Sequence, residues 1–427
     1  MMKKILITIH TSIIIFIFSI SFNTYANYII IPMDISQKNH LKAYGIAYWV
    51  LENELEVDWL LNYKGGSFLI KDMEEIKLEC TYRGVNFEVL SNNDVEEIYK
   101  FIASPSNNTD IVKLEKAPKI AVYSPKNKQP WDDAVTLALT YSEIPYDIIY
   151  DDEILSDLLP MYDWLHLHHE DFTGQYGKFY RSFKNAAWYI EQKKIFENDA
   201  KKNGFNKVSE QKLEVVKKIK EYVGGGGFMF AMCSATDSYD IAISAKDTDI
   251  CKSMFDGDDI DPNAQQKLNF EETLAFQNFE IITDPNKYEF SNIDMTDKRR
   301  LLVTEENDFF TLFEFSAKWD PIPTMLCQNH ERIIKGFIGQ TTSFSTELIK
   351  PNVIIMGENK SLHESRYIHG TFGKGTWTFY GGHDPEDYKH RIGDPKTELE
   401  LYPNSPGYRL ILNNILFPAA KKKKQKT

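Results

Sequence analysis

The first hundred residues alternate short apolar runs with longer segments whose apolar residues lie three or four positions apart. The short runs have the length of buried strands, and the longer segments have the pattern of helices that pack on one face. Strands that alternate with helices predict a parallel sheet with helices covering its faces. We therefore expect residues 27–103 to form a small α/β unit. Its strands are expected at Tyr28–Pro32, Val57–Leu61 and Phe87–Leu90, and its helices at His40–Glu52, in the residues up to Cys80, and from a cap at Asn93 with Glu96.

A second and longer series of strands and helices begins after a polar segment. Residues 104–110, SPSNNTD, are turn-forming types, so residues 104–117 are predicted to be a linker. Residues 118–419 are then expected to form a second α/β domain with insertions near residues 172–208 and 253–350. Its strands are expected at Lys119–Tyr123, Tyr146–Tyr150, Asp163–Leu167, Phe228–Met232 and Thr376–Tyr380, and its helices at Asp132–Tyr141 and from a cap at Ser209.

The two ends of the chain differ in composition from the rest. Two lysines precede an apolar run that extends to Phe22, and small residues follow up to Ala26. This pattern predicts a secretory signal peptide, residues 1–26, and therefore a periplasmic or secreted protein; an uncleaved anchor is the alternative. No later run is long and apolar enough to span a membrane, so no integral membrane segment is expected after cleavage. Residues 420–427 form a basic tail.

Composition and charge narrow the classes of partner. Of the 427 residues, 42% are hydrophobic and 26% are charged, as is ordinary for a globular protein with a core. The net charge of −13 argues against nucleic acid as the main partner. The aromatic content of 13% suits a dense core, and it also suits the binding of a small molecule or carbohydrate. The four cysteines show no zinc-finger spacing, and the sequence does not choose among their pairings.

The first segment that carries chemistry is GGGGFMFAMCSATD, a glycine run and a predicted buried strand that ends at Cys233. A nucleophile on a strand-to-helix turn needs small neighbours two residues away on each side, and Ala231 and Ala235 meet that need. Backbone N–H groups of the following turn would then stabilise an oxyanion. The alternatives for Cys233 are an inert cysteine at the end of a core strand and a disulfide with Cys251.

The second segment is FGKGTWTFYGGHDPEDY, a predicted strand followed by two glycines and His383. Gly382 and the glycine before it let the backbone approach a ligand closely. His383 is a candidate general base for Cys233, oriented by Asp384 or Glu386. Ligands of open α/β sheets lie beyond the carboxyl ends of the strands, so one pocket is expected there. A structural histidine is the alternative.

A third segment, HLHHED, ends at Asp171 and follows another predicted strand. Strand alternation places His168 and Glu170 on one side and His169 on the other. These residues are expected to line the same pocket. No cofactor is predicted, because the spacing matches no specific metal motif. A divalent metal ion is the alternative, since imidazoles and carboxylates are suitable ligands.

The loop KNKQPWDD follows the first strand of the second domain and contains Trp131, Asp132 and Asp133. In an open α/β sheet such a loop faces the ligand crevice. Trp131 is therefore a candidate to stack on a ring of the ligand, and an ordinary surface loop is the alternative.

The two motifs GGGFMFAMCSATD and FGKGTWTFYGGHDPEDY together resemble the ThuA-like branch of the class I glutamine amidotransferase-like superfamily, over roughly residues 118–419. The resemblance implies a flavodoxin-like three-layer α/β/α sandwich. ThuA-like proteins usually carry histidine where this chain has Cys233, whereas the amidotransferases carry cysteine there. The amidotransferases follow it with a His-x-Glu element, and the element from His383 to Glu386 is one residue longer. Neither relative transfers its mechanism unchanged.

Over its whole length the chain also resembles an exported Bacteroidota family labelled asparagine synthetase B. That activity requires an N-terminal cysteine nucleophile and a pyrophosphate loop of SGG-x-DS type, and the sequence contains neither. The label is therefore a family name and not a predicted function.

Three functions are consistent with these residues. The first is a thiol-dependent hydrolase or transferase that uses Cys233 on a small amide or carbonyl compound. The second is a non-catalytic carbohydrate-binding or cell-envelope protein that retains the pocket. The third is a metal-dependent hydrolase whose ligands are His168, Glu170 and His383. Nothing in the sequence fixes the oligomeric state.

Overall fold

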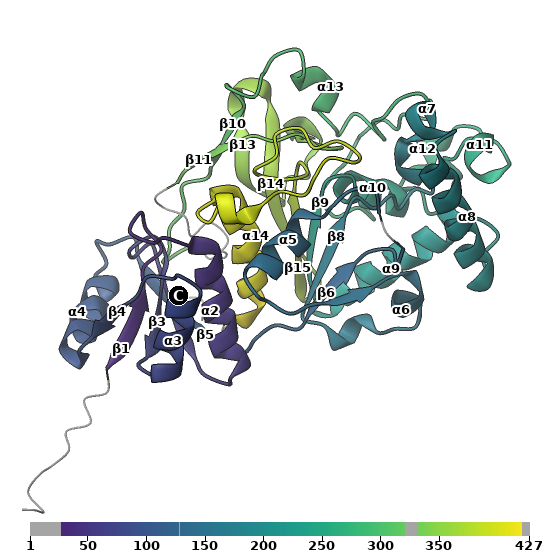
Figure 1. The fold of residues 1–427 in the computed structure, drawn as a ribbon. Helices are drawn as coiled ribbons and strands as arrows, with labels where there is room; N and C mark the ends of the chain where they lie inside the picture. Colours follow the sequence, from purple (N-terminus) through teal and green to yellow (C-terminus); the bar gives the residue numbers. More distant parts are fainter. Residues whose placement is uncertain (1–26, 128, 321–330, 421–427) are drawn as a thin grey trace, which may run out of the picture.

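The computed structural model describes residues 27–127, 129–320 and 331–420, and the chain there is mixed α/β. Figure 1 shows a smaller N-terminal unit and a larger unit, each built around its own sheet. The predicted signal peptide, Cys327 and residues 421–427 lie outside the described residues. Within the described ranges, no helix combines the length and the apolar character needed to cross a membrane.

The N-terminal sheet is antiparallel throughout, so the prediction of a parallel sheet is wrong. Its strand order is β4-β1-β3-β2-β5, and all four pairings are antiparallel. Two of its strands were not predicted: β3 forms a hairpin with β2, and β5 lies inside the predicted linker. The predicted strands β1 and β4 also pair antiparallel. The strands are β1 (Tyr28–Ile31), β2 (Val57–Leu61), β3 (Ser67–Lys71), β4 (Glu88–Leu90) and β5 (Asp110–Leu114).

Three helices cover the two faces of this sheet. Helix α4 packs on one face through Val95, Ile98 and Ile102, whereas α2 and α3 pack on the other. The cap of α4 is a reciprocal capping box between Ser91 and Asp94, so the predicted cap at Asn93 is wrong. The helices are α2 (His40–Glu52), α3 (Glu74–Tyr82) and α4 (Asn92–Ala103).

The N-terminal unit packs on the larger unit through α2, which contacts α14 (Pro406–Leu416) and α5 (Ala134–Tyr141). One apolar core runs from the sheet of the first unit across these helices to the large sheet. The buried Arg409 of α14 donates to the carbonyl oxygens of Met33 and Gly65, at 3.2 and 2.9 Å. The two units therefore share buried apolar and polar contacts.

The large sheet is half parallel and half antiparallel. Its order is β11-β10-β13-β14-β15-β9-β8-β6-β7, and β12 pairs with β14. The five strands from β15 to β7 are parallel, as the sequence predicts. The antiparallel half was not predicted, and part of it comes from the region predicted as an insertion. The strands are β6 (Ile120–Tyr123), β7 (Asp147–Ile149), β8 (Trp164–His168), β9 (Phe228–Met232), β10 (Phe309–Leu312), β11 (Ile333–Lys335), β12 (Phe344–Ser345), β13 (Ile354–Asn359), β14 (Glu364–Phe372) and β15 (Gly375–Tyr380).

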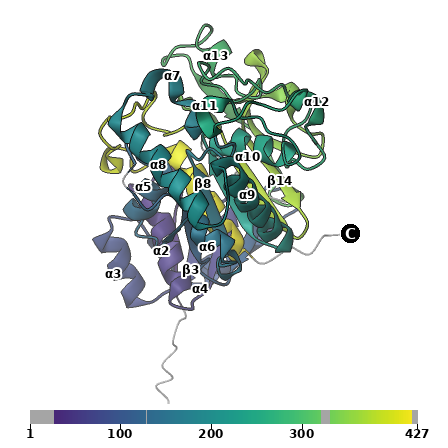
Figure 2. The ribbon, with the colours of Figure 1, turned by 90° about the vertical axis from the view of Figure 1, so that its right-hand side faces the viewer.

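Helices cover both faces of the parallel half. Ile120 and Val122 face the core shared with α5 and α14, whereas Ala121 and Tyr123 face the core of α9 and α10. The view in Figure 2 brings α6, α8, α9 and α10 to the front. The N-cap of α9 is Lys207, two residues before the predicted cap. The remaining helices are α6 (Asp151–Leu155), α7 (Tyr180–Phe183), α8 (Ala187–Lys202), α9 (Val208–Gly225), α10 (Ala235–Ser244), α11 (Ser253–Asp256), α12 (Ala264–Lys267) and α13 (Thr296–Arg299).

The register of three adjacent parallel strands brings the chemistry-bearing segments together. His168 of β8 and Tyr380 of β15 both pair with Met232 of β9. The residues that follow these positions therefore leave the sheet at the same edge. This edge carries Cys233, His383 and the two histidines at the end of β8.

Candidate functional site

Cys233 forms the turn between β9 and α10 with a left-handed backbone. Its φ is 55°, and such a conformation costs a non-glycine residue about 1–3 kcal/mol. The side chain is 1% exposed. Burial raises the pKa of the thiol to about 12, although the backbone N–H groups of Ser234 and Gln340 interact with the sulfur. The thiol is therefore protonated at neutral pH unless a cation binds to it.

Cys233 carries no disulfide. Among the described cysteines, Cys80, Cys233 and Cys251 are free and buried. The sulfur of Cys251 instead contacts the carbonyl oxygen of Thr173 at 3.2 Å. The alternative of a Cys233–Cys251 disulfide is therefore wrong.

His168 and His383 meet ring to ring in front of the sheet edge. His168 Nε2 and His383 Nδ1 are 3.3 Å apart. The other nitrogen of each ring faces a carboxylate: His168 Nδ1 lies 2.8 Å from Asp133, and His383 Nε2 lies 3.5 Å from Asp132. Each ring thus has one nitrogen that faces a carboxylate and one nitrogen that faces the other histidine.

His169 lies on the same side as His168, so the predicted alternation fails here. Strand β8 ends at His168, and His169 takes a left-handed backbone with a φ of 54°. Its ring stacks on that of His168 with 3.7 Å between centroids, and lies 4.2 Å from that of His383. Regular alternation requires an extended backbone, and the left-handed residue turns the second histidine toward the first.

Four ligand atoms converge at this point. The sulfur of Cys233 and one ring nitrogen from each of His168, His169 and His383 all lie within 4.8 Å of one another. We call these four residues the Cys–His cluster. Burial lowers the pKa of His168 to about 4 and that of His169 well below its ordinary value. Both imidazoles are therefore neutral at neutral pH, and neutral imidazole is the form that binds metal ions.

Asp133 supports the cluster from the start of α5. One carboxylate oxygen accepts the Thr136 N–H at 2.8 Å and caps the helix. The other lies 3.0 Å from His166 Nε2, in addition to its approach to His168. Burial alone would raise the pKa of Asp133, but His166 and His168 hold it well below its ordinary range. An ionised carboxylate therefore backs the cluster.

A second group shares His383 with the cluster. Asp132, His383 and His390 each offer one ligand atom within 4.8 Å of the others, and we call them the Asp132 group. His390 Nε2 lies 2.9 Å from Asp132, and its Nδ1 lies 2.8 Å from Asp387. Sequence reasoning missed His390 entirely. The only pattern that pointed to it was its position a few residues after the motif of His383.

The two predicted partners of His383 bind elsewhere. The Asp384 carboxylate accepts the Glu386 N–H at 2.9 Å and the Thr397 hydroxyl at 2.8 Å. Burial raises the pKa of Glu386, whose carboxyl also interacts with Ser405. The acid that faces His383 is Asp132, because the turn after His383 folds back toward the start of α14.

Several residues predicted to line the pocket surround a small cavity next to the Cys–His cluster. Trp131, His169, Glu170 and Asp171 all line a cavity of about 20 Å³. Glu170 lies 3.7 Å from Lys212 Nζ, and Asp171 accepts the Thr173 hydroxyl. Burial raises the pKa of Glu170 to about 8.

Trp131 belongs to an aromatic cluster. Its ring centroid lies 5.6 Å from that of Phe179, 5.9 Å from that of Trp188 and 5.7 Å from that of His169. The indole therefore packs against the chain itself and covers one side of His169.

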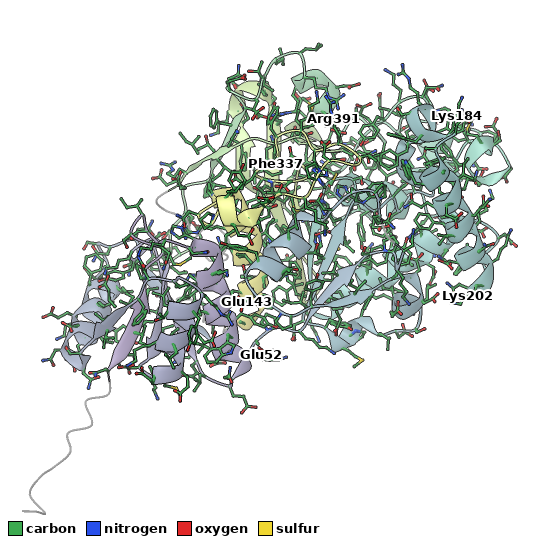
Figure 3. All side chains as sticks on the ribbon, in the orientation of Figure 1. Glu52, Glu143, Lys184, Lys202, Phe337 and Arg391 are labelled. Carbon is green, nitrogen blue, oxygen red and sulfur yellow. The ribbon has the colours of Figure 1, made fainter. Side chains whose placement is uncertain are left out.

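A segment of the predicted insertion closes over the site from the other side. Gly382 has a φ of 98°, and a Cβ there would lie 2.5 Å from the ring of Phe337. A Cβ at Gly339 would lie 2.7 Å from the backbone nitrogen of His383. Phe337 and Arg391, both labelled in Figure 3, belong to the two segments that cover this edge. Glycine is needed at both positions, because a Cβ would collide with the Phe337 ring at position 382 and with the His383 backbone at position 339.

Comparisons with known proteins do not show which family the chain belongs to. No protein-family model matches it, and no curated protein does. The cytoplasmic protein STM3548 from Salmonella typhimurium is 11% identical, with a TM-score of 0.35 over 71% of this chain and 100% of that one. A β-galactosidase from Bacillus circulans sp. alkalophilus is 8% identical, with a TM-score of 0.25 over 64% of this chain and 29% of that one. Likenesses at these scores carry no argument about this protein.

Proposed function

We propose that this protein is a metal-dependent hydrolase in which the Cys–His cluster holds a transition-metal ion. The observation that carries the proposal is the 3.3 Å approach of His168 Nε2 to His383 Nδ1, with a thiol and a third imidazole converging on the same point. Each of these two rings also has a carboxylate at its outer nitrogen. Carboxylates behind ligating histidines are the usual outer support of a metal site.

The chemistry of the donors favours a borderline or soft cation such as zinc. Sulfur and imidazole nitrogen are the ligands that zinc prefers in proteins. Burial keeps the Cys233 thiol protonated at neutral pH. A bound cation would reverse this, because a coordinating thiol loses its proton outright. The Cys–His cluster is a different ligand set from the one that the sequence suggested, His168, Glu170 and His383. Glu170 is left out because it pairs with Lys212.

The proposed substrate is a small amide or carbonyl compound. A metal ion at this edge that keeps an open coordination position would act as a Lewis acid toward a carbonyl oxygen. A cavity of about 20 Å³ lies at His169, and a hollow of about 320 Å³ is lined by Tyr288. These volumes favour a small substrate over a polymer.

The proposed fold family is the flavodoxin-like, amidotransferase-like sandwich. In chain order the parallel strands of the large sheet are arranged 2-1-3-4-5, from β7 through β6, β8 and β9 to β15. That order is typical of flavodoxin-like folds, whose ligands bind beyond the carboxyl ends of the strands. The position of the Cys–His cluster at this edge supports the same proposal.

Metal analysis of the full chain, purified without chelator, tests the proposed function. We expect bound transition metal, and in cobalt-substituted protein a thiolate-to-cobalt absorption band that Cys233→Ser abolishes. Cys80→Ser is the matched control, because Cys80 is also buried and free. The expected activity is hydrolysis of small amides or esters that chelation removes and metal restores. Full hydrolytic activity in a metal-free preparation would overturn the proposal.

A thiol-dependent hydrolase is the second candidate, and the left-handed backbone of Cys233 favours it. Catalytic nucleophiles occupy such strained strand-to-helix turns. In this candidate His383 is the base, and Asp132 orients it from 3.5 Å. Alkylation of Cys233 with iodoacetamide in chelated protein should then abolish hydrolysis. Unchanged turnover by Cys233→Ala excludes this candidate.

A further inference from the structure

The ring of His383 has an unusual position between two groups of ligand atoms. Its Nδ1 faces His168 in the Cys–His cluster at 3.3 Å. Its Nε2 faces Asp132 at 3.5 Å, on the side where His390 also lies. The two nitrogens of one imidazole therefore belong to two separate sets of donors.

The atoms of the Asp132 group are buried and lack aligned hydrogen bonds. Among the described residues, no hydrogen-bond partner reaches either carboxylate oxygen of Asp132, or the Nε2 atoms of His383 and His390. The distance of 2.9 Å between His390 Nε2 and Asp132 is short enough for a hydrogen bond, but the geometry does not align for one. Buried polar atoms without partners are rare, and an ion that binds several of them at one point would satisfy them together.

The surrounding chain fixes these side chains in place. Asp132 directly precedes the helix cap of α5. The Gly393 N–H donates to the Pro130 carbonyl at 3.1 Å, which holds the loop of His390 against the loop of Asp132. His390 Nδ1 lies 2.8 Å from Asp387 and its Nε2 lies 2.9 Å from Asp132, so the ring is held between two carboxylates, which raise its pKa to about 9. A divalent cation bound by Asp132 would displace the proton from His390 Nε2 and bind the lone pair that it leaves.

We propose that Asp132, His383 and His390 bind a second divalent cation, and that His383 bridges the two ions as an imidazolate. The bridge rests on the proposed function, because it requires an ion in the Cys–His cluster. On loading both ions, His383 releases its ring proton, His390 releases its Nε2 proton and Cys233 releases its thiol proton to solvent, as metal binding at such ligands requires.

The two ions have different roles in this arrangement. Four protein ligands close the coordination of the ion in the Cys–His cluster, as in structural zinc sites. Two imidazoles and one carboxylate leave positions open at the second ion, as in catalytic sites. The second ion is therefore the one that accepts the substrate carbonyl.

A cobalt titration of the chelated full chain tests the second site. We expect wild type to bind two equivalents of Co²⁺, with the thiolate-to-cobalt band. His390→Gln should bind one equivalent and keep the band, whereas Cys233→Ser should lose the band. His363→Gln, at an exposed histidine, is the control and should bind as wild type does.

The outcomes separate this inference from the proposed function. If wild type and His390→Gln both bind one equivalent of Co²⁺ with the thiolate band, the second site is overturned and the first is kept. If wild type binds one equivalent of Co²⁺ without the thiolate band, and His390→Gln binds none, the first site and the bridge are overturned and the second site is kept. Protein that binds no cobalt overturns both.

Two further measurements guard against misfolding and test the bridge. Asp387→Asn retains every ligand and releases only the support of His390 Nδ1, so we expect the second ion to bind about 10–100-fold more weakly. Affinity equal to that of wild type would overturn the support assigned to Asp387. An imidazolate couples the spins of two cobalt ions, so the paramagnetic resonance signal per cobalt in wild type should fall below that of His390→Gln. An equal signal per cobalt would overturn the bridge.

Discussion

At the scale of single residues, the candidate site depends on two left-handed backbones. His169 and Cys233 have φ values of 54° and 55°. Each costs about 1–3 kcal/mol and persists because the surrounding structure determines it. Both positions come directly after a strand, so the unusual conformation turns each side chain toward the same small volume. Two consecutive histidines can therefore face one centre, which an extended strand does not allow.

A buried histidine outside the site makes stability depend on pH. His369 of β14 is fully buried, its Nδ1 lies 2.9 Å from the Thr378 hydroxyl, and burial lowers its pKa to about 3. The folded pKa lies below the unfolded value, so only the unfolded chain takes up this proton as the pH falls below about 6.5. The free energy of unfolding should therefore fall by about 2 kcal/mol from this group between pH 7 and pH 5.

Denaturant unfolding at several pH values checks this prediction. His369→Leu should lose most of this pH-dependent component, although it also changes stability at neutral pH. The control is His363→Gln, because His363 is exposed on the same unit. If His369→Leu and wild type lose stability in parallel as the pH falls, His369 does not stay neutral in the folded protein.

At the scale of elements, α2 packs so closely on the end of α5 that only glycine fits at position 45. A Cβ at Gly45 would lie 1.8 Å from the carbonyl oxygen of Ser142. The neighbour is backbone, so the helices must separate to admit a methyl group. We expect Gly45→Ala to destabilise the protein by about 1–3 kcal/mol, despite the higher helix propensity of alanine.

Gly225, at the end of α9, is the matched control for this substitution. A Cβ there meets nothing within 4 Å. Gly225→Ala should leave the free energy of unfolding unchanged or raise it by up to about 1 kcal/mol. Equal effects of the two substitutions in thermal unfolding would mean that the contact of α2 with α5 is not tight.

The same scale shows why the sequence predicted some elements and not others. Helix α2 and strands β2 and β9 have the predicted bounds, because their apolar patterns end at clear turn residues. Strand β3 was hidden because its apolar run follows β2 after a few residues and resembles the start of a helix. Strand direction is a property of pairing between distant segments, so a pattern along the chain could not distinguish the antiparallel sheet from a parallel one.

For the candidate site, the sequence predicted the edge of the sheet but not the partners. The carboxyl ends of predicted strands were enough to bring Cys233, His168 and His383 together. The pairing of His383 with Asp132 could not be predicted, because it depends on how the loop after residue 383 turns back. The position of His169 could not be predicted either, because a left-handed residue has no clear sequence pattern at histidine.

At the scale of the whole molecule, the two units are not independent bodies. One apolar core includes Ile29 and Trp59 of the first sheet, Leu410 of α14 and Phe230 of the large sheet. The Tyr48 hydroxyl donates to the Pro118 carbonyl at 2.8 Å across the junction. In Figure 1 the N-terminal unit lies directly against α14 and α5. Separate domains joined by a linker would instead make few contacts with each other.

A shared core predicts that both units unfold together. Calorimetry of the full chain should show one cooperative transition, because neither unit can lose its structure without exposing the apolar residues of the other. Arg409→Met should lower the temperature of this single transition. The substitution leaves the carbonyl oxygens of Met33 and Gly65 without this buried donor, at a cost of about 1–3 kcal/mol. Arg391→Met, at an exposed arginine, should leave the transition unchanged. Two resolved transitions, of which Arg409→Met shifts only one, would show that the units fold separately and that the candidate site does not depend on the N-terminal sheet.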